Sequence, residues 1–333
     1  MTPATRTLPQ AVLWREPSID GSQWALSASS SSPMSFIIER LSAPTTAFSG
    51  LTFPRYRPLV ESSKENTLAI AASSDLVPVG LALAEFDKKE AVARLLSLAV
   101  DASHRRRGLG GGLLRACEAA LADLGCREVA AYHSSRLPCA TAFAATLRRC
   151  GWPPPQVCQV RSAGRCGVLA AAIAEWPGVR RLLRNPDFTF MPWTTLTPTD
   201  ETAIDRLCQE PACSQYLSPK TWTGQIEPRI STVIRQGEEL VGWVLVRLDP
   251  EYSEPTLHCE AAYIRHDLWR SGLLVAGYLH VYRAAASCFG NDTILHFHTS
   301  PRLPGMMALT RRRFAPVSLW VDDWLESRKR LGG

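Results

Sequence analysis

A short basic, glycine-rich segment carries the clearest chemical signal in this chain of 333 residues. Residues 93–100 form an almost wholly apolar run that predicts a buried strand, and a helix is expected over residues 111–124. The first amide hydrogens of a helix lack an internal acceptor and carry partial positive charge. Glycine allows a ligand to approach the main chain, and guanidinium groups bind phosphate. The turn is therefore predicted to hold a diphosphate through Arg105, Arg106, Arg107, Gly108, Leu109, Gly110 and Gly111.

Two other phosphate motifs fit this segment poorly. The dinucleotide fingerprint needs a third glycine at a set offset within an early βαβ unit, and a P-loop needs Gly-Lys followed by Ser or Thr. Neither pattern is present here. A purely structural role stays open, in which the glycines only let the helix pack closely against the strand.

The spacing of Val100, Arg105, Gly108 and Gly110 after a buried strand resembles the acyl-CoA signature of the GCN5-related N-acetyltransferase (GNAT) superfamily. The resemblance covers residues 35–162 and, more weakly, 187–333. It implies a donor substrate, acetyl-CoA or a longer acyl-CoA, no metal, and transfer of the acyl group to an amine of a small molecule or peptide. In that family the strand before the loop splays from its neighbour and pairs with the pantetheine arm. The resemblance assigns that pairing to the backbone of Leu98, Ala99 and Val100.

The elements expected around the motif occur twice, which predicts two tandem GNAT-like domains of the α+β class, each with a mixed, mostly antiparallel sheet flanked by helices. Gly108 lies 25 residues before His133, and Gly272 lies 26 residues before His298. We therefore align His133 with His298. In the second copy Trp269 replaces Arg105 and Leu274 replaces Gly110, so this copy is expected to bind CoA poorly. The expected divisions are a mobile tail at 1–34, domains at 35–165 and 187–333, a helical linker at 166–186, and a final strand at 317–324.

The groups that move protons are less clearly marked. The tyrosine that many members of the family use as an acid is replaced by Leu147. Candidate substitutes are Tyr132 and His133, at the end of a strand of the first half, and Glu260 and His298, on two neighbouring strands of the second half. Each is also compatible with a structural role. His296 and His298 lie two residues apart without a third nearby ligand, so no metal site is expected.

The composition sets outer limits on function. The chain has a formal net charge of +6, and 46% of its residues are hydrophobic. The apolar stretches are too short to span a bilayer and no broad basic and aromatic patch is visible, so we expect no transmembrane segment and no nucleic-acid partner. Ten scattered cysteines without C-x-x-C or metal-ligand spacing indicate free thiols, and no secretory signal is visible, so we expect a cytoplasmic location. The basic run at 328–330 is expected on a solvated face. The tryptophans of the second half form either core or a peptide or lipid groove: Trp222, Trp243, Trp269, Trp320 and Trp324. A non-catalytic acyl-CoA sensor or scaffold remains the alternative function.

Overall fold

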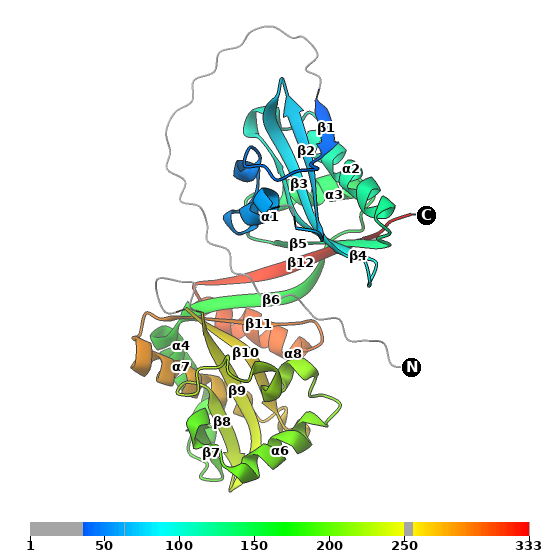
Figure 1. Ribbon diagram of the computed structural model, residues 1–333. Coiled ribbons are helices and arrows are strands. Elements are labelled where there is room, and N and C mark those ends of the chain that lie inside the picture. Colours follow the sequence, from blue (N-terminus) through cyan, green and yellow to red (C-terminus); the bar gives the residue numbers. More distant parts are fainter. Residues whose placement is uncertain (1–35, 63, 250–255, 333) are drawn as a thin grey trace. The chain divides into compact units, whose positions relative to one another are not determined.

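The computed structural model describes residues 36–62, 64–249 and 256–332. The tail expected at residues 1–34 lies outside the described residues. Two halves follow one another along the chain, and each contains a mixed sheet with flanking helices (Figure 1). This confirms the α+β class and the duplicated order of elements.

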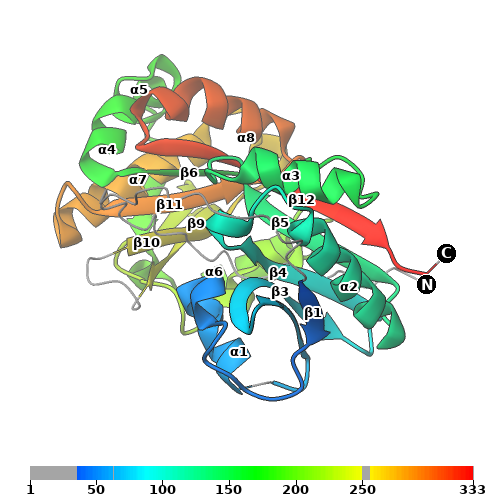
Figure 2. The same cartoon turned by 90° about the horizontal axis from the view of Figure 1, so that it is seen from above.

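In the first half, strands β1 to β4 are antiparallel neighbours, whereas β4 and β5 are parallel. The α2 and α3 helices contact each other on one side of this sheet (Figure 2). The elements are β1 (Ile37–Arg40), α1 (Arg57–Ser62), β2 (Thr67–Ser74), β3 (Val77–Asp87), β4 (Val92–Val100), α2 (Leu109–Asp123), β5 (Glu128–Ser134) and α3 (Ala140–Arg149).

The second half repeats this pattern. Strands β7 to β10 are antiparallel neighbours, and β10 and β11 are parallel. The expected linker contains a pair of helices, α4 (Cys166–Ala174) and α5 (Pro177–Leu182). The remaining elements are β7 (Phe188–Pro192), α6 (Pro198–Cys208), β8 (Thr232–Gln236), β9 (Glu239–Asp249), β10 (Thr256–Ile264), α7 (Leu273–Phe289), β11 (Ile294–Thr299) and α8 (Pro304–Leu309).

The two halves exchange their last strands. Strand β6 (Gln156–Arg165) pairs with β11 of the second half, and β12 (Trp320–Arg330) pairs with β5 of the first half. The two exchanged strands also pair with each other, so the order runs β1-β2-β3-β4-β5-β12-β6-β11-β10-β9-β8-β7 (Figure 1). The sheet is therefore continuous from one half to the other. The domain boundaries at residues 165 and 187 stay a prediction.

The last strand corrects two expectations. It begins at Trp320 and ends at Arg330, not at 317–324, and the basic run at 328–330 belongs to it. The Arg328 guanidinium lies 2.7 Å from Glu128 Oε1, and Lys329 Nζ donates to Glu118 Oε2 at 2.6 Å. Strand β12 is paired along both edges, so it lies inside the sheet, and Arg328 and Lys329 are not on a free solvated face. Its side chains alternate between the two faces of the sheet, where Arg328 and Lys329 meet their carboxylate partners.

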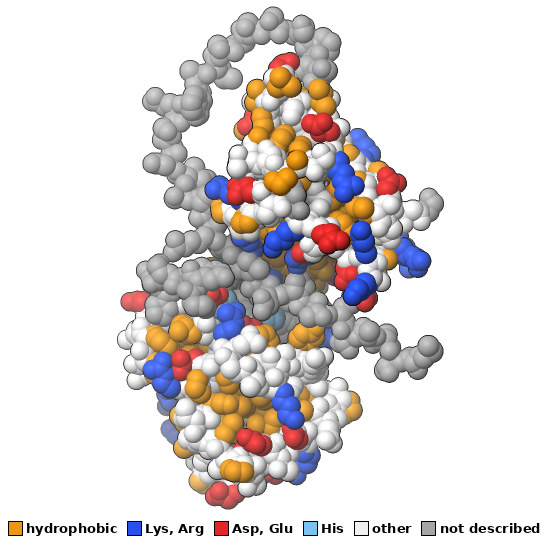
Figure 3. All heavy atoms as spheres, viewed as in Figure 1, with side chains coloured by type: hydrophobic (Ala, Val, Ile, Leu, Met, Phe, Trp, Pro, Cys, Tyr) orange, Lys and Arg blue, Asp and Glu red, His pale blue; other side chains and the backbone are white. Residues whose placement is uncertain are grey.

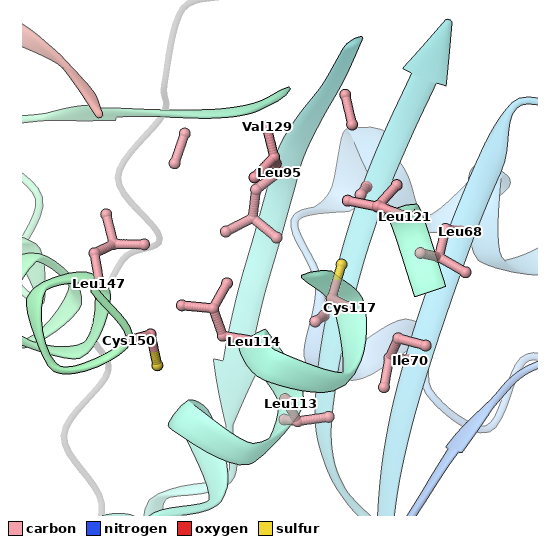
Figure 4. Close-up of a cluster of buried hydrophobic side chains, with 14 of the residues drawn as sticks. Leu68, Ile70, Leu95, Leu113, Leu114, Cys117, Leu121, Val129, Leu147 and Cys150 are labelled. Atoms are coloured by element: carbon pink, nitrogen blue, oxygen red, sulfur yellow. The ribbon is translucent and has the colours of Figure 1, made fainter. Parts of the chain in front are cut away.

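The main core of the first half lies between α2 and the sheet. The α2 side chains Leu113, Leu114 and Leu121 are fully buried against β2, β3 and β4 (Figure 4). Gly80 on β3 is needed for this contact, because a Cβ there would lie 2.7 Å from Leu113 Cδ1. The opposite face of the same sheet packs against α1 through a smaller apolar cluster that includes Leu96. Close packing of α2 on β2, β3 and β4 therefore fixes the position of the helix, and of the basic loop before it, relative to the sheet.

On the face shown in Figure 3, basic and acidic side chains are interspersed rather than gathered by sign. None of the helices in the described ranges has the length and apolar character needed to cross a membrane.

Candidate functional site

Strands β4 and β5 separate after a short stretch of pairing. Their parallel register runs only from Val92 opposite Glu128 to Leu95 opposite Ala131. On its other side β4 pairs with β3 along its whole length, with a bulge at Leu96. Beyond Leu95 the β5-facing edge of β4 is therefore not paired with any described strand, and Leu98, Ala99 and Val100 lie along it. An open edge of this kind offers main-chain donors and acceptors to an extended ligand.

The loop that follows β4 is fixed by its own hydrogen bonds. Asp101 accepts from the Ser103 amide at 3.0 Å and lies 3.3 Å from His104 Nδ1. The Ser103 hydroxyl also donates to Asp101, and this bond first, followed by those of His104 and the Ser103 amide, holds the pKa of the Asp101 carboxyl below its ordinary value. Arg105 Nε donates to the Val100 carbonyl at 3.0 Å. Arg106 and Gly108 adopt positive φ angles of 62° and 81°, which turn the chain into α2.

The start of α2 presents unpaired amide hydrogens. Gly108 is the N-cap and supplies no side chain, and the first helical bond runs from the Gly112 amide to the Gly108 carbonyl at 3.0 Å. Across the described part of the chain, no acceptor satisfies the amides of Gly108, Leu109, Gly110 and Gly111. The first turn also lacks an acidic residue, so its partial positive charge is not neutralised.

Packing explains some glycines of this segment and not others. A Cβ at Gly112 would lie 3.0 Å from Ile38 Cδ1, so close packing restricts this position. A Cβ at Gly110 would make only ordinary contacts, 3.7 Å to Val100 and 3.8 Å to Thr146. The purely structural reading therefore does not account for Gly110. A bare main chain at this position would allow a ligand the closest contact.

His133 and Tyr132, adjacent on β5, point to opposite faces of the sheet. The His133 side chain lies on the α2 and α3 side, 2% exposed, with its ring edge-on to Phe143 at 5.1 Å. Both of its ring nitrogens are buried, and neither has a hydrogen-bond partner in the described residues. Burial lowers the pKa of His133, so the ring is neutral at pH 7. Leu147, at the usual place of the acid, is a core residue with 1% exposure.

Tyr132 is tied to the exchanged strand β12. Its hydroxyl donates to Glu326 Oε1 at 2.5 Å and accepts from Arg328 Nη2 at 3.1 Å. Burial, followed by the hydrogen bond to Glu326, raises the pKa of Tyr132 above its ordinary value. The phenol therefore keeps its proton and holds β5 to β12.

Glu260 and His298 lie at the corresponding fork of the second half. There β10 and β11 pair only from Thr256 to His258, and the β10 bulge falls on Glu260. Arg247 Nε donates to Glu260 Oε1 at 2.8 Å, while burial raises the pKa of the Glu260 carboxyl. His298 lies opposite Arg161 of β6, and burial, then Arg161, lower its pKa to about 4. These two candidates belong to β10 and β11, whereas Tyr132 and His133 belong to β5.

The alignment of His133 with His298 is wrong by one residue. Val92 lies opposite Glu128 in the first half, and the equivalent Thr256 lies opposite Ile294 in the second. Counted from these pairs, Tyr132 matches His298, and His133 matches Thr299. The reason is the helix between the strands, which has 15 residues in α2 and 17 in α7.

The loop before α7 has the same turn as the loop before α2 but different side chains around it. Gly272, with φ 87°, caps α7 as Gly108 caps α2. Trp269 replaces Arg105, and Leu274 stands two residues after the cap, where the first half has Gly110. No group of three or more His, Cys, Asp or Glu side chains that could hold a metal is found among the described residues.

Sequence analysis missed Arg161 and Phe143. Both lie on elements whose extent was foreseen, but their proximity to the candidate histidines depends on strand exchange and on helix docking. The available signal was an arginine in the interior of a strand, between Val160 and Ser162.

Comparisons with known proteins agree with this geometry. Residues 36–147 match the family model described as "Acetyltransferase (GNAT) family". A tandem GNAT protein from the clavulanic acid biosynthesis pathway superposes with a TM-score of 0.54 at 13% identity, covering 90% of this chain and 99% of that one. A GCN5-related N-acetyltransferase from Sphaerobacter thermophilus gives 0.53 at 15%, covering 90% and 96%. The search of curated proteins found no match. Residues 36–147 thus match the GNAT acetyltransferase family, and the chain has the fold of tandem GNAT proteins.

Proposed function

We propose that this protein is an acyl-CoA-dependent N-acyltransferase whose donor site is the fork between β4 and β5. The observation that carries the proposal is the set of unpaired amides at Gly108, Leu109, Gly110 and Gly111, beside the unpaired edge of β4. The amides and the guanidinium groups of Arg105, Arg106 and Arg107 bind the pyrophosphate. The pantetheine arm continues along Leu98, Ala99 and Val100 as an added strand.

The fork then places the thioester carbonyl near the end of β5. The lone pair of the acceptor nitrogen forms the new C–N bond, the C–S bond breaks, and the proton lost by the amine ends on the sulfur of CoA. His133 is the candidate carrier for this proton, because its neutral ring lies at the fork with both nitrogens unpartnered in the described chain. Holding the two reactants together supplies much of the remaining rate.

The second half is proposed to shape the acceptor site. Its own loop has Leu274 in place of Gly110, and a bulky side chain there keeps a diphosphate from the main chain. Glu260 and His298 contribute polar groups to this side. The acceptor is an amine of a small molecule or peptide, and the acyl group is acetyl or longer.

A charge-reversed glycine tests the donor site. Gly110→Glu places a carboxylate where the diphosphate binds, and we expect CoA affinity and acyl transfer to be lost together. Gly178→Glu is the control, because Gly178 is an exposed helical glycine at which an added Cβ would have no other atom within 4 Å. Unchanged CoA affinity in Gly110→Glu, measured by titration calorimetry, refutes the proposal.

One observation favours a second function, a non-catalytic acyl-CoA sensor. Leu147 fills the usual place of the acid, and the Tyr132 hydroxyl is occupied by Glu326 and Arg328. A sensor binds acyl-CoA but releases no thiol with any amine. Thiol release during incubation with a panel of amines distinguishes the two functions.

A further inference from the structure

The face of the sheet opposite α2 carries a positively charged group that the donor site does not use. Arg161 of β6 lies half-buried in the middle of the exchanged strands, with His298 opposite it on β11 and Asp322 opposite it on β12. Side chains in register on neighbouring strands point to the same face. Tyr132 of β5 and Trp324 of β12 belong to this face as well.

The Arg161 guanidinium is held in place without being neutralised. Its Nε and Nη2 atoms both donate to Gln159 Oε1 at 3.2 Å, and its plane lies 3.7 Å from the centre of the Trp324 ring. In the described chain no carboxylate lies within ion-pair distance of it. The nearest acid by register, Asp322, instead accepts from Ser135 Oγ at 2.8 Å. Among the described residues this half-buried cation has only a neutral amide and an aromatic ring as partners, which leaves its charge for an anionic ligand.

The neighbouring histidines add donors without adding charge. His258 and His296 stack at 5.1 Å, and His258 Nε2 and His296 Nδ1 are buried with no hydrogen-bond partner in the part of the chain described. His258 Nε2 lies 3.4 Å from Asp249 Oδ2, outside hydrogen-bond geometry. Burial lowers the pKa of both rings to about 3, so they are neutral at pH 7.

The charge balance favours an anion with a single negative charge. Burial lowers the pKa of Arg161 to about 10; Asp322 opposes this shift and Arg55 adds to it. Asp322 is not within ion-pair distance of Arg161, so the single positive charge of Arg161 has no carboxylate partner among the described residues. A carboxylate matches this charge, and it is also flat enough to pair with a guanidinium side-on. A phosphate dianion does not match it.

The distance to the fork sets the size of the ligand. Strands β5 and β6 are separated only by β12, and neighbouring strands lie about 4.8 Å apart, so the backbones of β5 and β6 are about 10 Å apart. The Arg161 guanidinium stacks on Trp324, which pairs with Ser134 at the end of β5, so this spacing is the interval between the guanidinium's strand and the β5 end of the fork. An extended peptide covers about 3.5 Å per residue. A tripeptide therefore spans the interval, whereas a free α-amino acid does not.

We propose that the acceptor is a short peptide, or an amine of similar length, whose carboxylate is bound by Arg161 on the Trp324 ring while its amine reaches the fork. The proposal rests on the function proposed above, because that function places the thioester at the fork. Arg161 is a specificity-determining residue in this proposal. The carboxylate of the acceptor is the ion-pair partner that Arg161 lacks among the described residues.

The experiment compares two probes that differ only in their end group. Ala-Ala-Ala and Ala-Ala-Ala-amide are titrated calorimetrically into the full-length protein, with and without saturating CoA. We expect the free carboxylate to bind about tenfold more tightly than the amide. Arg161→Met should remove this difference, and Arg161→Lys should keep only part of it, because an ammonium group cannot pair side-on. Arg165→Met is the matched control, since Arg165 lies on the same strand with 51% of its side chain exposed.

Equal affinity for the two probes, binding of neither, or an unchanged preference in Arg161→Met overturns the proposal. Acetyl-CoA affinity is measured on every variant and separates loss of the acceptor site from misfolding. If the carboxylate preference is found without acyl transfer to any peptide, the carboxylate site stands and the proposed transferase function falls.

Discussion

Arg105 and Trp269 make the same hydrogen bond at equivalent places in the two halves. Arg105 Nε donates to the Val100 carbonyl at 3.0 Å, and Trp269 Nε1 donates to the Ile264 carbonyl at 2.9 Å. In each case the acceptor is the last residue of the strand before the loop. The duplicated turn is therefore held by one side-chain N–H in both halves, and the cation is not needed for its shape. The charge of Arg105 remains available for a ligand.

Arg105→Trp tests this separation of roles. We expect the turn to keep its fold, with a melting temperature close to that of the parent protein. CoA affinity should fall about 10- to 150-fold, because one charge-assisted phosphate contact contributes about 1.5–3 kcal/mol. Calorimetric titration with CoA measures the affinity and a thermal melt measures the fold. A large drop in melting temperature contradicts the equivalence of the two bonds.

His133→Phe tests the buried imidazole. A ring of similar shape without polar atoms removes two unpartnered buried nitrogens, so we expect the free energy of unfolding to rise by about 1 kcal/mol. Acyl transfer should fall at least tenfold if His133 carries the proton. Urea denaturation and thiol release are the measurements. Unfolding at lower urea than the parent protein would show that the ring has a structural partner.

The stability of the second half should depend on pH. The pKa values of His258, His296 and His298 are lowered to about 3, 3 and 4 in the folded protein, whereas an unfolded histidine titrates near 6.5. Between pH 6.5 and 4 the unfolded chain therefore binds more protons than the folded one, and stability falls as the pH falls. The contribution of these rings is complete above pH 6.5 and is lost toward pH 4.

Replacing the stacked pair isolates this effect. The double variant His258→Phe, His296→Phe should show a shallower loss of stability between pH 6.5 and 4 than the parent protein, as measured by urea denaturation at several pH values. His266→Gln, at an exposed position, is the control and should leave the slope unchanged. An unaltered slope in the double variant would mean that carboxylates, not these rings, set the acid sensitivity.

The parts of this structure that the sequence predicted well are local. The loop from Asp101 to Gly110 folds through contacts within a few residues, so residue types and spacing describe it. The exchange of β6 and β12 has no such signature, because alternation along a strand shows which face is buried but not which edge finds which partner. The histidine alignment failed for a related reason: two additional residues in α7 changed the register without changing the order of elements. Arg161 became a candidate only when β6 was placed beside β11.

The strand exchange predicts that a substitution near the end of the chain destabilises the first half. Lys329 Nζ donates to Glu118 Oε2 and to the Cys150 carbonyl, both at 2.6 Å, and Glu118 also accepts from Trp152 Nε1 at 2.6 Å. Glu118 is 9% exposed, so Lys329→Met leaves a nearly buried carboxylate with one neutral donor. We expect the free energy of unfolding, measured by urea denaturation, to fall by about 2–3 kcal/mol.

Arg330→Met is the matched control, because Arg330 is exposed at the end of the same strand, and it should change stability by less than about 0.5 kcal/mol. Amide hydrogen exchange locates the effect. In Lys329→Met, protection should fall in α2 and β5, which lie about 200 residues earlier in the chain, since β12 is the strand that closes the open edge of β5. Loss of protection confined to residues 320–330 would show that β12 detaches without disturbing the first half, and that the exchanged strand is not part of its cooperative unit.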